Sequence, residues 1–204
     1  MRGLLLKDFY LMRAGAAAMI VTFIIVGVGI TFLIDPWLVS LISSVIFGML
    51  SASTIGVDKQ CGWNKLAATL PVSRATVIDS KFLAYLLCSA VGFGLGVVLC
   101  LVIATVRPEL LTSPEMIRIQ LSLAAAMAVF GGALIIPSGF LLSVEKSLIS
   151  SMVTYPIIAG IFIAVASLTD DRILACNILL AVSVIVFAAS WLASRKLIAK
   201  RDIH

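Results

Sequence analysis

The chain has 204 residues, of which 62% are hydrophobic and 12% are charged, and its mean hydropathy is +1.19. Soluble domains contain roughly 45 to 50% apolar and about 25% charged residues. The composition therefore excludes an ordinary soluble domain and indicates an integral membrane protein. The net charge of +5 is accounted for by membrane topology and anionic lipid headgroups, so no nucleic-acid partner is expected.

Six apolar stretches follow one another along the chain, each about as long as the roughly 20 residues that an α-helix needs to cross a bilayer. They predict an all-α membrane protein with six transmembrane helices in a single domain, 1–204. The predicted spans are 14–34, 37–57, 82–106, 119–142, 147–168 and 173–194.

The first thirteen residues differ from the spans because Arg2, Lys7, Asp8 and Arg13 stand among leucine and aromatic side chains. This mixture is typical of a helix that lies in the membrane interface before the first span. A plain extension of the first span is the alternative.

The distribution of Lys and Arg predicts the orientation. With six spans both termini share a side, and that side carries all of the 15 basic residues except Arg107, Arg118 and Arg172. Because cytoplasmic loops are enriched in Lys and Arg, both termini and the loop 58–81 are expected in the cytoplasm.

The loop 58–81 is the one polar passage of any length between the spans. In a helix over 62–70, Trp63, Leu66 and Leu70 share one face, which makes it a short amphipathic helix. Pro71 is expected to end this helix, and Ser73 is a candidate N-cap for the helix that follows.

Chemical motifs are absent from the spans. No ionisable residue lies in the middle of a predicted span, which argues against a proton- or ion-coupled transporter. The chain has no HExxH, GxSxG or phosphate-loop motif. Its four cysteines lack metal-like spacing, so free thiols are favoured over a disulfide, and no metal or catalytic residue is predicted.

Small residues and prolines mark particular positions in the spans. Gly92 and Gly96 have GxxxG spacing, and Gly131 and Gly132 are adjacent. Such residues let helices approach closely, and packing within one bundle is favoured over a dimer contact. Pro137 and Pro156 lie inside predicted spans and are expected to kink them.

The start MRGLLLKDFYLMR and the passage D-K-x-x-G-W-N-K-L-x-x-T-L-P-V-S-R, followed by Ser80 and Lys81, carry a family resemblance. Together with six spans they resemble the permease subunits of ABC-2-type ATP-binding-cassette exporters. The closest resemblance is to short permeases of bacterial peptide exporters, the group that includes phenol-soluble modulin and bacteriocin-export systems.

The resemblance implies a multi-pass permease domain in the bacterial cytoplasmic (inner) membrane. It implies no catalytic site or cofactor in this chain, because ATP and Mg²⁺ are bound by a separate ABC ATPase subunit. It also implies pairing, as a homodimer or with a sister permease, and export of amphipathic or hydrophobic cargo such as peptides.

In that family the loop between the second and third spans is a coupling helix that docks on the ATPase. The resemblance implies a main contact at Asp58, Trp63, Asn64, Lys65, Leu66, Leu70, Pro71, Ser73 and Arg74, and a minor one at Glu145 and Lys146. The alternative is that the loop rests on lipid, with Trp63 anchored among the headgroups. The rival function is a non-transporting scaffold or immunity protein that recruits partners through the same loop.

Overall fold

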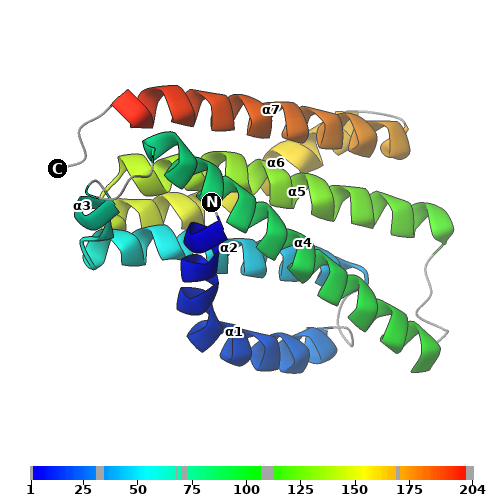
Figure 1. The fold of residues 1–204 in the computed structure, drawn as a ribbon. Coiled ribbons are helices and arrows are strands. Elements are labelled where there is room, and N and C mark those ends of the chain that lie inside the picture. The colour runs from blue at the N-terminus through cyan, green and yellow to red at the C-terminus, as the bar shows by residue number, and fades with distance from the viewer. Residues whose placement is uncertain are drawn as a thin grey trace.

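The computed structural model describes residues 2–30, 35–67, 69, 73–106, 113–168 and 171–200. All regular structure in these ranges is helical, which confirms the all-α class (Figure 1). The helices are α1 (Arg2–Ile30), α2 (Leu38–Gln60), α3 (Trp63–Ala67), α4 (Arg74–Val106), α5 (Pro114–Leu141), α6 (Val144–Leu168) and α7 (Arg172–Lys200).

Five of the described helices, α2 and α4 to α7, are long and apolar enough to cross a membrane. The sixth candidate is α1, whose two parts, Gly3–Arg13 and Gly15–Gly29, are bent by 56° relative to each other. The bend falls at the predicted boundary between the N-terminal helix and the first span. Residues 31–34, the end of that predicted span, lie outside the described residues.

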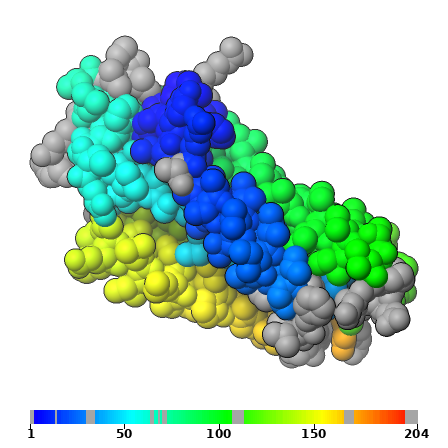
Figure 2. Space-filling model, turned by 90° about the horizontal axis from the view of Figure 1, so that it is seen from below, coloured from blue at the N-terminus to red at the C-terminus, as the bar shows by residue number. Residues whose placement is uncertain are grey.

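One end of the bundle gathers most of the described polar connections. It holds α3, the adjoining ends of α2 and α4, the turn between α5 and α6, and the C-terminal end of α7 (Figure 1). We call it the α3 end. The first part of α1 lies against it, beside the last turns of α2, whereas the second part runs along α2 and α4 toward the opposite end (Figure 2).

The centre of the bundle is α2, whose buried face is rich in serine. Ser40, Ser43, Ser44 and Thr54 are all at most 3% exposed. Each hydroxyl donates a hydrogen bond to the carbonyl three residues earlier in its own helix, at 2.7 to 3.0 Å. A buried hydroxyl needs such a partner, so α2 satisfies these groups without help from neighbouring helices.

Glycines allow the closest helix contacts. A Cβ added at Gly92 of α4 would lie 2.6 Å from the carbonyl oxygen of Ser43, and one at Gly96 would collide with Ser40 and Ser43, all on α2. Gly131 of α5 faces Tyr155 of α6, and Gly132 faces Tyr85 of α4. Both glycine pairs therefore serve contacts between helices of the same chain.

Neither Pro137 nor Pro156 ends its helix, since α5 and α6 each continue through the proline. Proline lacks the N–H that would bond the carbonyl four residues earlier. For Pro137 that carbonyl belongs to Ala133, and the Ser190 hydroxyl of α7 donates to it at 2.5 Å. The side chain of α7 thus replaces the missing backbone donor.

Candidate functional site

The candidate site is built at the α3 end, where a tight turn joins α2 to α3. The backbone N–H groups of Cys61 and Gly62 bond the carbonyls of Val57 and Lys59 at 2.9 and 3.3 Å. Gly62 has a φ of 68°, the left-handed region that only glycine adopts without cost. A glycine here lets α2 stop and α3 turn away from its axis.

The helix predicted over 62–70 is described as α3, Trp63–Ala67. Leu70 and Pro71 lie outside the described residues. Beyond them the predicted N-cap is confirmed, because the Ser73 hydroxyl accepts the backbone N–H of Thr76 at 3.2 Å at the start of α4.

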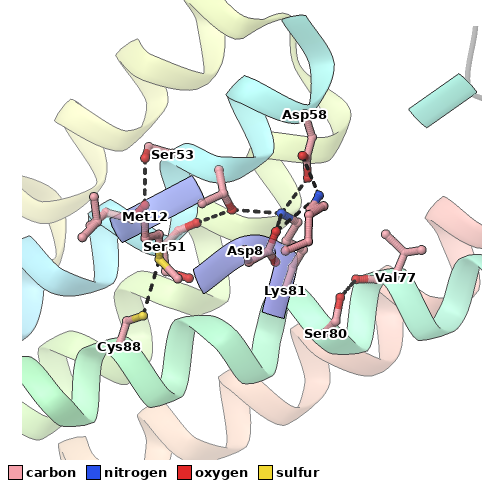
Figure 3. A network of polar contacts seen from close by, with 12 residues as sticks. Asp8, Met12, Ser51, Ser53, Asp58, Val77, Ser80, Lys81 and Cys88 are labelled. Atoms are coloured by element: carbon pink, nitrogen blue, oxygen red, sulfur yellow. Dashed lines mark hydrogen bonds and ion pairs between the residues drawn. The ribbon is translucent and has the colours of Figure 1, made fainter. Parts of the chain in front are cut away.

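Four charged side chains from three segments meet beside α3. Lys7 and Asp8 come from the first part of α1, Asp58 from the end of α2, and Lys81 from the beginning of α4. Figure 3 shows Lys81 lying between Asp8 and Asp58. We call these four residues the charge ring.

The charges of the ring alternate. The Lys7 ammonium lies 2.6 Å from Oδ1 of Asp58 and 3.3 Å from Oδ1 of Asp8. The Lys81 ammonium lies 2.7 Å from Oδ2 of Asp58 and 2.8 Å from Oδ1 of Asp8. Each charge thus has two neighbours of opposite sign, and the ring as a whole is neutral.

Most of the ring is shielded from solvent. The side chains of Asp8, Asp58 and Lys81 are 1%, 7% and 4% exposed, whereas Lys7 is 20% exposed. Lys81 also donates to Oγ1 of Thr54 at 2.9 Å, so its three ammonium protons all have acceptors. A buried ion is tolerated only when paired and hydrogen-bonded in this way.

The ring also contacts α3. The Lys7 ammonium lies 4.3 Å from the centre of the Trp63 ring, a cation–π distance. Two buried polar atoms here, Oδ2 of Asp8 and Nε1 of Trp63, have no hydrogen-bond partner among the described residues. The cluster therefore keeps one acceptor and one donor unused.

The residues predicted to contact the ATPase differ in their exposure to solvent. Leu66 is 55% exposed, and Ser73, Arg74, Glu145 and Lys146 are exposed as well. Trp63 is half-buried under Lys7, and Asp58 is buried with both oxygens bound to lysines. The side chains of Asn64 and Lys65 are not among those described. The role of all these residues in docking stays a prediction.

Other polar contacts hold the α3 end together. Asp79 of α4 accepts a hydrogen bond from Nε1 of Trp191 at 2.7 Å and lies 3.2 Å from Nε of Arg195, both on α7. Lys59 of α2 donates to the carbonyls of Phe140 and Leu142 at 3.1 and 2.5 Å. These carbonyls belong to the last turn of α5 and the residue after it, where helices leave acceptors without internal partners.

The sequence alone does not predict that these four residues pair. It predicts Asp58 as part of the docking surface, Lys7 and Asp8 as part of an interfacial helix, and Lys81 as part of the cytoplasmic loop 58–81. An available signal was the presence of opposite charges at the ends of three segments expected on the same side of the membrane. Within the described residues, no group of three or more His, Cys, Asp or Glu side chains is arranged to hold a metal ion.

The described fold is that of a multi-pass helical membrane protein with a polar, loop-bearing end. A family model described as ABC-2 family transporter protein matches residues 3–199, and the chain therefore belongs to the ABC-2 transporter family. Membership makes it a permease component of an ABC transporter and implies association with an ABC ATPase. Comparisons with curated proteins and with solved structures find no match.

Proposed function

We propose that this chain is the permease subunit of an ATP-driven exporter and that a separate ATPase docks on the α3 end. The observation that carries the proposal is the exposed surface made by α3, the start of α4 and the α5–α6 turn. Leu66, Arg74, Glu145 and Lys146 are exposed on it. Protein interfaces commonly combine an apolar centre with a polar rim.

The charge distribution supports a cytoplasmic location for this end. Most of the basic residues on the described helix ends lie here, among them Lys59, Arg74, Lys81, Lys146 and Arg195, whereas Arg118 and Arg172 lie near the opposite end. By the positive-inside rule the α3 end faces the cytoplasm, where ATP is available. The membrane is the bacterial cytoplasmic membrane, and ATP and Mg²⁺ bind to the ATPase subunit.

The cargo proposed is amphipathic or hydrophobic, with peptides as the leading class, and transport is outward. Large apolar side chains are exposed along α1, α4, α6 and α7, including Ile25, Val98, Ile163 and Ile185. Part of such a surface contacts lipid, and part is available to a second permease, either a second copy or a sister subunit. A pair with twofold symmetry would enclose a shared pathway that a single bundle lacks.

The experiment that tests docking is copurification with the ABC ATPase encoded beside this chain, in nanodiscs. Leu66→Asp places a charge at an exposed position of α3, so the permease should fold and insert normally but lose the ATPase. Met116→Asp is the matched control, because Met116 is 37% exposed near the start of α5, at the end of the bundle opposite α3. A wild-type chain that never binds the ATPase would favour a scaffold or immunity protein.

A further inference from the structure

The charge ring is the only connection of its kind among the described residues, because it ties three segments that are far apart in the chain. Lys7 and Asp58 are 51 positions apart, and Asp8 and Lys81 are 73 apart. The segments joined are the first part of α1, the last turn of α2 and the second turn of α4. Of these three, α2 packs against α3, which carries the proposed docking surface, and α1 reaches α3 through Lys7, whose ammonium lies over the Trp63 ring.

The attachments of these segments differ in strength. Helices α2 and α4 are interlocked along their length, with Gly92 and Gly96 of α4 pressed against serines of α2. The first part of α1 presents Leu6, Phe9 and Tyr10 outward, at 56 to 60% exposure. Its buried attachments are the ring and Met12, which contacts Cys88 of α4 at 3.7 Å between sulfur atoms.

The attachment of α3 is also slight. It is five residues long, and among the described helices only α2 packs against it. Among the described contacts, Lys7 links Trp63 of α3 to the ring through its ammonium. A force applied to α3 therefore reaches Asp58 of α2 through Lys7 as well as through the backbone.

We infer that the charge ring is the joint that makes the first part of α1, α3 and the α2–α4 pair move as one body when the ATPase displaces α3. Lys7 and Asp8 act as positioning residues, because they act on α3 and on α4 through other side chains. This inference rests on the proposed function. Its physical basis is that separating buried opposite charges is unfavourable, so the segments shift together and not apart.

The first test measures distances in the complex of permease and ATPase. The permease keeps its charge ring, and its four native cysteines are replaced so that only the introduced positions carry labels. Spin labels at Tyr10 of α1 and Leu87 of α4, which are 60% and 53% exposed, should keep the same separation with and without ADP–vanadate. Labels at Val106 of α4 and Leu174 of α7, at the end opposite α3, should change separation. A nucleotide-dependent change between Tyr10 and Leu87 would overturn the inference.

The second test removes Lys7 and Asp8 together. The double variant Lys7→Met, Asp8→Asn deletes one charge of each sign and leaves the 2.7 Å pair between Asp58 and Lys81. The burial of an unpaired charge is thereby avoided, so the protein should insert and bind the ATPase. The change in separation between Val106 and Leu174 should be lost, together with most of the permease-dependent stimulation of ATP hydrolysis.

The controls separate a joint from a structural role. The variant Lys7→Arg, Asp8→Glu keeps all four charges and should retain both the distance change and the stimulation. Arg195→Gln removes an ion pair whose arginine is 41% exposed on the same end, and should behave as wild type. A normal distance change in the Lys7→Met, Asp8→Asn variant overturns the inference. Loss of ATPase binding by the wild type would instead overturn the proposed function.

Discussion

Single glycines on α4 decide how closely it approaches α2. At Gly92 an added Cβ would lie 2.6 Å from the Ser43 carbonyl oxygen and 2.7 Å from Cβ of Phe47. Both neighbours are close to the backbone and have little freedom to retreat. Gly92→Ala should therefore destabilise the protein by about 1–3 kcal/mol, as overpacked cores do. Thermal unfolding in detergent would show this as a lower Tm.

Gly94 provides the matched control for Gly92. It lies on the same helix, two residues away, and a Cβ added there meets nothing within 4 Å. Gly94→Ala should leave Tm unchanged or raise it slightly, because alanine favours the helix by up to about 1 kcal/mol. Equal losses at both positions would contradict the assignment, because Gly94 has no neighbour within 4 Å and the close approach of α2 to Gly92 could not then be the cause.

The helix contacts of the glycines could be predicted from the sequence better than the pairing of the charges. Glycine spacing is a local pattern, and the close contacts of Gly92 and Gly96 follow from it once two helices pack. The pairing of Lys7 with Asp58 is not local, because it depends on the 56° bend in α1 that brings residues 51 positions apart together. No residue pattern within one segment encodes that contact.

A neighbouring helix can supply the hydrogen-bond donor that a proline lacks, as α7 does for α5. The Ser190 hydroxyl bonds the Ala133 carbonyl that Pro137 leaves free. Ser190→Ala should cost about 0.6–1 kcal/mol, the usual size of such a bond between membrane helices. In a Pro137→Ala background the residue at 137 supplies the backbone donor itself, so the same substitution should cost less.

A double-mutant cycle on unfolding free energies measures this pair. Ser138→Ala is a suitable control, since its hydroxyl bonds the carbonyl of Ile135 in its own helix. Additive effects of the Pro137 and Ser190 changes would show that the hydrogen bond from Ser190 to the Ala133 carbonyl does not stabilise the protein by replacing the missing donor.

The predicted spans overlap the observed helices, but they do not give the residues at which these helices begin. The span predicted over 82–106 belongs to a helix that begins at Arg74, and the one over 119–142 to a helix that begins at Pro114. Apolar runs mark the part of a helix suited to lipid, while the polar turns beyond it extend the helix to its cap. Both extensions start after a serine N-cap, Ser73 and Ser113.

Taken as a whole, the molecule is polar at both ends but bears most of its described basic side chains at one. If the α3 end is cytoplasmic, Cys61 is the thiol to label, because it is exposed while Cys100 and Cys176 are buried. A membrane-impermeant maleimide should modify Cys61 in inside-out vesicles and not in intact cells. Ser113→Cys, exposed near the opposite end, should react in intact cells when Cys61 is replaced by serine.

Reaction of Cys61 in intact cells would show the opposite orientation and place the proposed docking surface away from ATP.

The family and the helical class could both be predicted from the sequence, since they depend on composition and on one loop that carries a motif. The number of helices that cross the membrane completely was harder to predict from the sequence. It depends on α1, whose two parts, Gly3–Arg13 and Gly15–Gly29, form a candidate span when taken together, while residues 31–34 lie outside the described residues.

The burial of the charge ring has a consequence for the ionic strength at which the transporter works. Dissolved ions screen exposed charges over about 8 Å at physiological salt but have little access to a cluster whose members are mostly 1–7% exposed. The ion pair of Asp79 with Arg195, whose arginine side chain is 41% exposed, should weaken more as salt rises. The ring should not, so the link from α3 to the helices should persist through osmotic changes that alter the salt content of the cell.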